Sequence, residues 1–388
     1  MSKKYFRLLW AVALWILMTG CARERHVAVN EDGAPCKATL AAVGDIYLTQ
    51  EQMLSAAAAD GSYDFSSAFS AVAGELTNAD LAVGNLEGNF CGAPYDTETR
   101  NYPEALATAL QGAGLDVLQT ANTYTIQNGL TGVQSTLQAI SNAGMQPLGT
   151  FASQSDRDEH PVLIREVNGI KIAMLAFTKG VDNVRLPEGT EYCVNLLYSD
   201  YDTSYSTVDT DAITACIEQA KAEQPDVIIA MVHWGSEYDS SISDSQTEIE
   251  DLLFQNGVDV ILGSHSHLVG KIAKKQITDK DGKEKNVLTA YSLGNFYGYD
   301  EMSATRESLI LQLEFTKYDD GTTEVSAVDY THIYLADCGE EAVCRYPVIH
   351  VENAISLYES HYYDRVSEEL YDILKKVPAD LKEQVEDE

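Results

Sequence analysis

Side chains that could hold a metal ion stand just past the ends of several apolar runs in this chain. They are Asp45, Asn85, Glu87, Asn122, His233, His265 and His267. Carboxylates supply anionic oxygens and histidines supply imidazole nitrogens, a mixture that suits Zn, Mn or Fe. Such a set could hold one ion or two, and a pair of ions about 3.5–4 Å apart would favour phosphoryl-transfer chemistry. The alternative is a polar crevice in which these side chains only satisfy one another.

The apolar runs have the composition of buried strands. We place strands at 38–43, 79–84, 115–119, 171–177, 227–232 and 258–262, and helices at 50–59, 65–76, 103–112, 131–143, 209–223 and 246–256. This alternation predicts βαβ units and a mostly parallel α/β sheet. In such a sheet the ligand crevice lies beyond the carboxyl ends of the strands. The polar residues would therefore gather along one edge.

The chain changes character after residue 270. Strand-like segments at 271–278, 287–293, 308–317 and 323–334 are separated by turn signals and predict an antiparallel part. Asn168-Gly169 lies between two apolar runs and predicts a hairpin. We treat 38–345 as the main domain and 346–388 as an acidic, helical C-terminal segment, in which Pro378 should break the last part.

The N-terminus has the pattern of a bacterial secretion signal. Three basic residues precede an apolar run at 8–18, which is too short for a bilayer core of about 30 Å. Met18-Thr19-Gly20-Cys21 resembles the lipobox, in which the cysteine is lipidated and becomes the mature N-terminus. We expect residues 1–20 to be a lipoprotein signal peptide, Cys21 the lipidation site and 21–37 a tether. This predicts an extracytoplasmic lipoprotein anchored at the cell surface.

The remaining cysteines would then lie in an oxidising compartment. Cys338 and Cys344 are close in sequence across a glycine and are the best candidates for a disulfide. No two cysteines have the CxxC spacing of a zinc or redox site.

Composition excludes several classes of function. The 388 residues include 60 Asp plus Glu and 26 Lys plus Arg, a formal net charge of −34. Non-specific binding of nucleic acid needs a basic surface, so we expect no nucleic-acid partner. The same charge opposes capture of any polyanion unless a metal mediates it. The 45% of hydrophobic residues exclude a disordered acidic protein.

Five segments occur in an order that resembles one known family. They are Val43-Gly44-Asp45-Ile46, Gly84-Asn85-Leu86-Glu87-Gly88, Val232-His233-Trp234-Gly235-Ser236-Glu237-Tyr238, Gly263-Ser264-His265-Ser266-His267 and Tyr291-Ser292-Leu293-Gly294-Asn295-Phe296. Together they resemble the CapA-type capsule biosynthesis family, which is linked to poly-γ-glutamate. That family is similar to the calcineurin-like metallophosphoesterases. The resemblance therefore implies a metallophosphatase-like four-layer α/β/β/α sandwich with a divalent-metal centre.

The resemblance also implies roles for individual residues. The metal ligands would be Asp45, Glu87, His233, His265 and His267, with His233 also catalytic. Asn85, Trp234, Glu237 and Asn295 would line the site.

One segment departs from the family, which typically has two asparagines and a histidine after an alanine. This chain reads Asn122-Thr123-Tyr124 after Ala121. A threonine hydroxyl is a poor bridging ligand, so we expect Asn122 to fill the ligand role. Tyr124 stands at the catalytic position, but a phenol with a pKa of about 10 is a weak general acid near neutrality. Metal binding with impaired hydrolysis is thus one outcome, and a metal-dependent hydrolase remains the other.

Three hypotheses follow. The first is a CapA-type surface lipoprotein in the synthesis, export or anchoring of an anionic polymer such as poly-γ-glutamate, with the polymer or its membrane synthase or export subunits as partners. The second is a secreted metallophosphoesterase that acts on small phosphoesters. The third is a catalytically dead lipoprotein that binds a glycan or peptide, which the altered motif and the Tyr-rich segment 193–209 favour.

Overall fold

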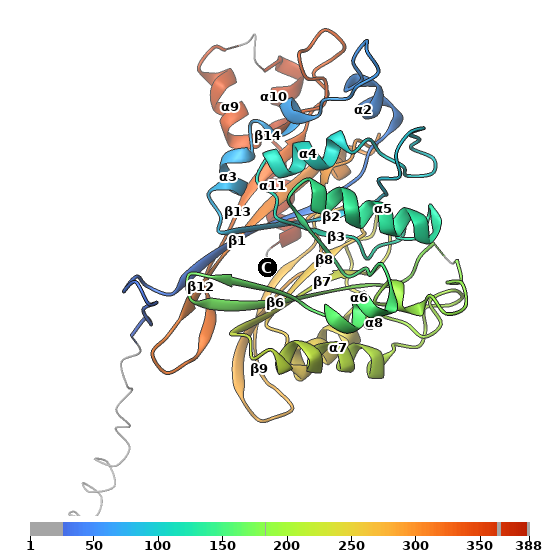
Figure 1. Cartoon of the computed structure of the whole chain (residues 1–388). Helices are drawn as coiled ribbons and strands as arrows, with labels where there is room; N and C mark the ends of the chain where they lie inside the picture. Colours follow the sequence, from blue (N-terminus) through green and yellow to red (C-terminus); the bar gives the residue numbers. More distant parts are fainter. Residues whose placement is uncertain (1–25, 183, 363–365, 386–388) are drawn as a thin grey trace, which may run out of the picture.

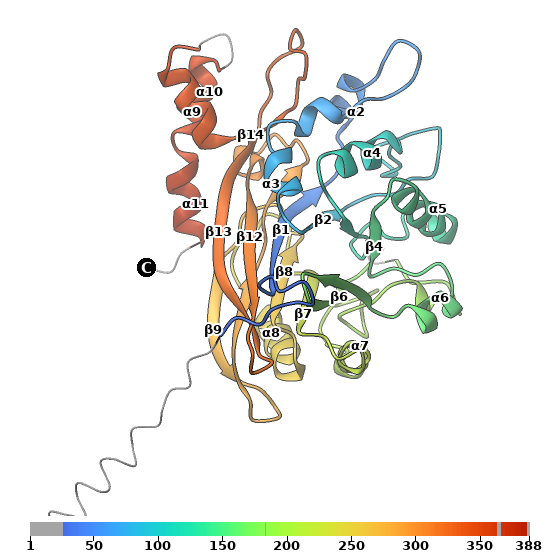
Figure 2. The same cartoon turned by 60° about the vertical axis from the view of Figure 1, so that its left-hand side comes forward.

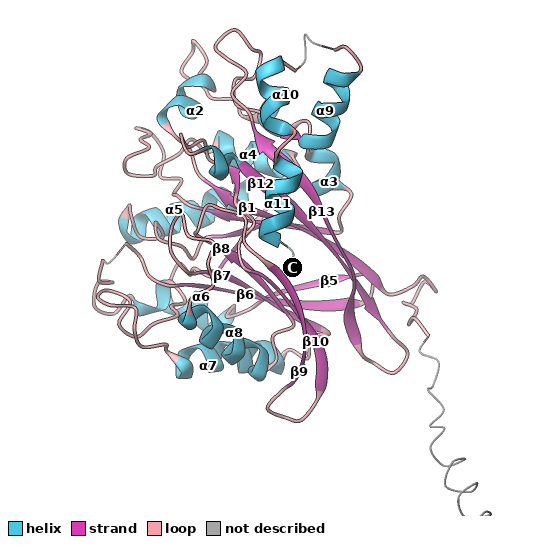
Figure 3. Cartoon of the chain, turned by 180° about the vertical axis from the view of Figure 1, so that it is seen from behind, coloured by secondary structure: helices cyan, strands magenta, loops and turns pink. Residues whose placement is uncertain are grey.

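The computed structural model describes residues 26–182, 184–362 and 366–385, and it places two β-sheets between layers of helices (Figures 1 and 3). The expected signal peptide and Cys21 lie outside the described residues. Within the described ranges, no helix has both the length and the apolar character needed to cross a membrane.

The first sheet has the strand order β14-β13-β12-β1-β2-β3-β4, and β11 pairs with β1 beside this path. Strands β1 to β4 run parallel, whereas β12, β13 and β14 add in antiparallel fashion. The strands are β1 (Lys37–Ile46), β2 (Leu81–Leu86), β3 (Val117–Gln119), β4 (Gln146–Leu148), β11 (Asn295–Tyr297), β12 (Glu307–Lys317), β13 (Thr323–Leu335) and β14 (Val348–His350).

The second sheet has the strand order β5-β6-β7-β8-β10-β9. Its four central strands are parallel, and each edge strand is antiparallel to its neighbour. The strands are β5 (Leu163–Val167), β6 (Ile170–Thr178), β7 (Val227–His233), β8 (Val260–Ser264), β9 (Ile272–Thr278) and β10 (Glu284–Ala290). The hairpin between β5 and β6 turns at Asn168 and Gly169, as predicted, and both have positive φ.

Most of the helices cover the outer faces of the two sheets, and the last three pack against the cluster between the sheets. The α-helices are α2 (Gln50–Ser55), α3 (Ala73–Thr77), α4 (Ala105–Gly112), α5 (Gly129–Asn142), α6 (Gln154–Glu159), α7 (Thr210–Ala222), α8 (Asp244–Asn256), α9 (Val351–Glu359), α10 (Glu368–Leu374) and α11 (Val377–Val385). In Figure 1, α4 and α5 lie over the first sheet, and α7 and α8 lie on the opposite side of the molecule.

Strand alternation explains the layers. Leu40 of β1 and Met174 of β6 belong to one buried cluster between the sheets. The intervening residue Ala41 faces a second cluster with α4, and Leu175 faces a third cluster with α7. Successive side chains of a strand point to opposite faces, so each buried strand contributes to two cores. The four-layer α/β/β/α sandwich expected from the sequence is confirmed.

The structure differs from the sequence prediction in detail. The helix expected at 65–76 is a 3₁₀ turn at Ser66–Phe69 followed by the short α3. The helix expected at 50–59 ends at Ser55. Strands β4, β11 and β14 have only three residues each, which is too short for a periodic pattern to be recognised.

The C-terminal segment packs against the sandwich. Helices α9 to α11 follow β13 along its length (Figure 2), and Leu374, Val377 and Leu381 are fully buried in the cluster between the sheets. The helical segment is divided next to Pro378, as expected: α10 ends at Leu374 and α11 begins at Val377. Pro378 lies in the first turn of α11, where the absent N–H of a proline removes no intrahelical hydrogen bond.

The expected disulfide is not formed. Cys338 and Cys344 are both free thiols, like the other cysteines in the described part of the chain. Cys338 is exposed, whereas Cys344 packs against the cluster on the outer face of the first sheet. The two cysteines lie in the loop between β13 and β14, where the Cys338 amide donates to the carbonyl of Arg345 (2.8 Å).

Glu307 on β12 is buried near α11 and gives the fold a pH dependence. Burial raises the pKa of Glu307 to about 7; the Asp380 carboxylate adds to this and Arg306 opposes it. A carboxyl whose folded pKa is raised contributes stability at low pH that is lost as the pH rises through the folded value. Wild-type protein should therefore lose about 2 kcal/mol relative to Glu307→Gln between pH 5 and pH 8.

Urea unfolding at the two pH values measures this difference. Glu284→Gln, at an exposed position on β10, is the matched control and should change little. Equal pH dependence of the free energy of unfolding in wild type and Glu307→Gln would contradict the prediction.

Candidate metal centre

Five predicted ligands meet where the carboxyl ends of both sheets adjoin. Asp45 is the last residue but one of β1 and Glu87 follows β2 of the first sheet, while His233 ends β7 of the second. His265 and His267 follow β8 in the next loop. All five are buried, and Asp45 and His233 have no exposed surface. The prediction that polar residues after the strands gather at one edge therefore holds for these five side chains.

The ligand atoms form two groups that share Glu87. One group is Glu87, His233 and His265, and the other is Asp45, Glu87 and His267. Within each group the atoms lie within 4.8 Å of one another. Each group combines carboxylate oxygen with imidazole nitrogen, the donor set expected for a first-row divalent cation.

Neighbouring polar groups orient the imidazoles. The Thr178 hydroxyl donates to the carbonyl of Gly180 (2.9 Å) and lies 3.5 Å from Nδ1 of His233. This leaves Nε2 of His233 facing Glu87 Oε1 at 2.9 Å. On His267, Nδ1 lies 2.9 Å from Oδ1 of Asn295. Polar neighbours of this kind fix the ring orientation of metal-binding histidines.

Asn85 and Asn295 lie at the site, as the sequence predicts. The Asn85 amide donates to Asp45 Oδ1 (2.8 Å) and Glu87 Oε1 (3.3 Å) and so links the two carboxylates. Asn295 pairs with Asp45 in the parallel register of β11 and β1.

The cluster is strongly coupled electrostatically. Burial alone would raise the pKa of Glu87, but the charge of His267 and the hydrogen bond to His233 hold it below its usual range. Burial alone would lower the pKa of His267, but the carboxylates of Glu87 and Asp45 raise it. Burial and the charge of His233 hold the pKa of His265 well below its usual range. Protein groups thus compensate the buried negative charge, and a cation could do the same.

The backbone around the cluster is strained and closely packed. His265 and His267 have φ of 99° and 60°, values that cost a non-glycine residue on the order of 1–3 kcal/mol. Gly44 allows β1 to approach the loop before β11, since a Cβ there would lie 1.8 Å from the carbonyl oxygen of Gly294. Such strain is typical of sites where position matters more than local stability.

Asn122 lies beside the two ligand groups and bonds mainly to its surroundings. Its amide nitrogen donates to the carbonyl of Leu86 (2.5 Å) and to Asn85 Oδ1 (3.3 Å), and its oxygen accepts from the Tyr124 amide (3.0 Å). Asn122 therefore positions the loop and Asn85. A direct metal contact by Asn122 remains a prediction.

Tyr124 contacts Arg100, which the sequence analysis did not single out. The Tyr124 hydroxyl accepts from Nη2 of Arg100 (3.0 Å), and the guanidinium carbon lies 4.1 Å from the ring centroid. Burial raises the pKa of the Tyr124 phenol; Arg100 opposes this, while Glu87 and Glu237 add to it. This makes Tyr124 a still weaker proton donor than an ordinary tyrosine.

Of the other two residues predicted to line the site, Glu237 lines a cavity there and Trp234 does not. Glu237 lines a cavity of about 530 Å³ that also has His267 and Tyr124 in its wall. Trp234 does not line it: the indole is buried in the outer core of the second sheet, stacks on Tyr291 and donates to its carbonyl (3.0 Å). The apolar requirement of that core outweighs the place of Trp234 in the motif.

Sequence reasoning missed other contributors. Thr178 follows the predicted strand 171–177, so the strand-end rule would have found it if applied there. Tyr47 stands two residues after Asp45 and contacts the His267 ring edge-on at 5.5 Å between centroids. Arg100 lies in the loop between β2 and α4, and no pattern marked it.

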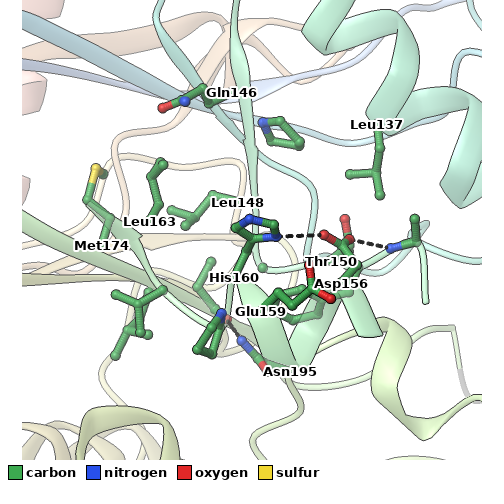
Figure 4. Close-up of a pocket in the computed structure, with 18 of the residues that line it drawn as sticks. Leu137, Gln146, Leu148, Thr150, Asp156, Glu159, His160, Leu163, Met174 and Asn195 are labelled. Atoms are coloured by element: carbon green, nitrogen blue, oxygen red, sulfur yellow. Dashed lines mark hydrogen bonds and ion pairs between the residues drawn. The ribbon is translucent and has the colours of Figure 1, made fainter. Parts of the chain in front are cut away.

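A larger hollow of about 890 Å³ lies elsewhere, between α5, α6 and the strands β4 to β6 (Figure 4). Its lining mixes apolar side chains with an exposed pair in which His160 Nδ1 lies 3.4 Å from Asp156 Oδ1. None of the candidate metal ligands lines it.

Comparisons with known proteins agree with the sequence motifs. Residues 39–300 match the family model described as bacterial capsule synthesis protein PGA_cap. The PGA biosynthesis protein CapA of Bacillus subtilis is 26% identical over 65% of this chain and 62% of its own length. The capsule biosynthesis protein CapA of Bacillus anthracis is 24% identical over 81% of this chain and 71% of its own.

Solved structures are more distant. A putative 5′-nucleotidase from Staphylococcus aureus aligns over 88% of this chain and 58% of its own, with 12% identity and a TM-score of 0.43.

The chain spans less than two thirds of the length of the B. subtilis relative. The family model nevertheless covers most of the chain, including every predicted metal ligand, and the chain belongs to the PGA_cap family of bacterial capsule synthesis proteins.

Proposed function

We propose that this protein is a CapA-type surface lipoprotein that acts in the synthesis, export or anchoring of a capsule-like anionic polymer such as poly-γ-glutamate. Family membership and the names of the two Bacillus relatives support this role. The proposed partners are the polymer itself or the membrane subunits that make or export it. The cluster around Glu87 is proposed as its metal-dependent, hydrolase-like site.

The observation that carries the proposal is the pair of buried ligand groups sharing Glu87. They fit a divalent cation, Mn, Zn or Fe, because buried carboxylates and imidazoles from both sheets converge with their ligand atoms close together. A bound cation would supply positive charge and Lewis acidity to an anionic substrate. This local charge would offset the repulsion expected from a chain with net charge −34.

Polar side chains of the protein would hold the candidate metal ligands in their orientations. Thr178 and Asn295 hold the rings of His233 and His267, and Asn85 holds the two carboxylates in register. His267 is the member of the cluster that forms part of the wall of the 530 Å³ cavity. We expect the polymer to reach the cluster through this cavity.

A second candidate is a site that binds the polymer end or a peptide without cleaving it. The specific observation in its favour is Tyr124, because its hydroxyl is engaged by Arg100 and its pKa is raised. The altered Asn122-Thr123-Tyr124 segment also favours binding without cleavage. Substrate turnover distinguishes the two candidates.

Metal binding can be measured on full-length protein treated with chelator and reloaded with Mn²⁺ or Zn²⁺. His265→Ala should weaken one ligand group, His267→Ala the other, and Glu87→Gln both, because Glu87 is shared. His160→Ala, an exposed histidine outside the cluster, is the control. Elemental analysis showing fewer than about one ion in ten wild-type chains would refute metal binding.

Function can be tested by complementation in cells that lack the native gene. Wild type should restore the surface polymer, and Glu87→Gln should reduce it at least about tenfold if the cluster acts in the pathway. Glu166→Gln, an exposed position on β5, should complement fully. Full complementation by Glu87→Gln at equal protein level would show that the cluster is dispensable.

The lipid anchor has its own test. Cys21→Ser should move the protein from the membrane fraction to the aqueous fraction, because a thioether-linked lipid needs the cysteine sulfur. Detergent phase partition and metabolic labelling with a fatty acid measure this. An unlabelled wild-type protein would overturn the anchor.

A further inference from the structure

The cavity beside the metal centre has an acidic wall with two arginines. Its charged lining residues are Glu51, Arg100, Glu237, Asp300, Glu301, Asp337 and Arg345, and His267 joins them. Acidic groups dominate, so any anion entering this cavity needs a local positive partner.

Of these two arginines, Arg100 alone lacks an acidic partner among the residues that the structure describes. Arg345 forms a two-pronged ion pair with Asp337, with Nε to Oδ1 at 3.1 Å and Nη2 to Oδ2 at 3.2 Å. Among the described residues, Arg100 has no carboxylate within 4.0 Å; its side-chain hydrogen bonds go to the hydroxyls of Tyr102 (3.3 Å) and Tyr124 (3.0 Å).

Most of the hydrogen-bonding capacity of Arg100 is unused. A guanidinium carries five N–H donors, and the described residues take up two of them. Tyrosine hydroxyls do not neutralise its charge. The remaining donors form the planar fork that binds an oxyanion with two parallel hydrogen bonds.

The guanidinium is held in place before any ligand arrives. Its central carbon lies 4.1 Å from the ring centroid of Tyr124 and 5.3 Å from that of Tyr47. The Arg100 carbonyl accepts from the amide of Asn89 at 2.7 Å, and the Tyr102 hydroxyl donates to the carbonyl of Glu87 at 3.2 Å. The Arg100 loop is thus attached to the segment that carries Glu87.

The same contacts place Arg100 close to the metal centre. Tyr47 touches Arg100 with its face and His267 with its edge, with 5.5 Å between the ring centroids of Tyr47 and His267. One aromatic ring therefore separates the guanidinium from a candidate metal ligand, and both line one cavity.

We propose that Arg100 is the residue that binds a carboxylate of the substrate beside the metal centre, with Tyr47 and Tyr124 as its positioning residues. This rests on the proposed function and names the recognition step within it. Tyr124 is then a part of the binding site, in place of the proton donor that the family motif implies.

Charge favours a carboxylate over a phosphate. One guanidinium neutralises one negative charge, and the acidic residues around it repel the second charge of a phosphate dianion. The cavity suits a single carboxylate-bearing unit at the end of a chain better than the middle of a polyanion, in which every unit carries a charge.

The experiment measures ligand binding by calorimetry to full-length protein in detergent with excess chelator, so that no metal contributes. The probes are γ-glutamylglycine, a dipeptide with a net charge of about −1 near neutral pH, and inorganic phosphate. Arg100→Gln should weaken dipeptide binding at least about tenfold, and Arg100→Lys should restore part of it because a lysine keeps the charge but loses the fork. Wild type should bind phosphate more weakly than the dipeptide.

Arg345→Gln is the matched control, because it removes the same charge from the same cavity but from a residue already paired with Asp337. It should weaken binding less than about threefold. Equal losses in Arg100→Gln and Arg345→Gln, tighter binding of phosphate, or no dipeptide binding by wild type would each overturn the proposal. An unchanged near-ultraviolet circular dichroism spectrum confirms that Arg100→Gln is folded.

The measurement separates this inference from the proposed function. Dipeptide binding that depends on Arg100 without metal supports the recognition step even if the reloaded protein binds no metal. If the protein binds metal but dipeptide binding does not depend on Arg100, the proposed function is retained and the recognition step is rejected.

Discussion

The burial of Glu87 between two sheets is the constraint on which the site depends. Its carboxylate comes from the first sheet, and the imidazole that contacts it, His233 at 2.9 Å, comes from the second. A buried charge without a partner is unfavourable by several kcal/mol. The sheets must therefore keep their relative position closely for the histidines to compensate it, and Asn85 and Asp45 extend the same network.

Close packing maintains this position. Gly44 approaches Gly294 where a side chain would not fit, and Asp45 bonds through its amide to the Gly294 carbonyl at 2.9 Å. Helices α9 to α11 add buried residues to the cluster between the sheets. The strained backbone of His265 and His267 is tolerated because this packing over-determines the loop.

The net negative charge of the protein affects which ligands the cavity can bind. A net charge of −34 opposes an anionic ligand in general, yet His267 of the candidate metal cluster and Arg100, which forms no ion pair with any described residue, line the same cavity. In the proposed recognition step Arg100 binds one carboxylate, and the acidic residues around it repel a second negative charge. This is a different recognition problem from binding a polyanion along a basic groove.

Much of the architecture follows from local patterns. Near-continuous apolar runs predicted the central strands, and the polar residues after them predicted five side chains that meet at one edge. The family resemblance implied that Trp234 lines the site, but its large apolar ring is buried in the core instead of the cavity wall. The sequence analysis also missed Thr178, although that residue ends β6 in the same way that His233 ends β7.

The sequence by itself determined the fold class, the family and the chemical types of the ligands, because alternation, strand-end position and ordered motifs are local properties. Only the tertiary structure decided which candidate ligands share Glu87, that Cys338 and Cys344 are free thiols, and that Arg100 and His267 contact the same ring, that of Tyr47. These facts depend on contacts between residues far apart in the chain or on the path of a loop. Neither is encoded in spacing, because loop geometry and sheet packing are set by the whole core.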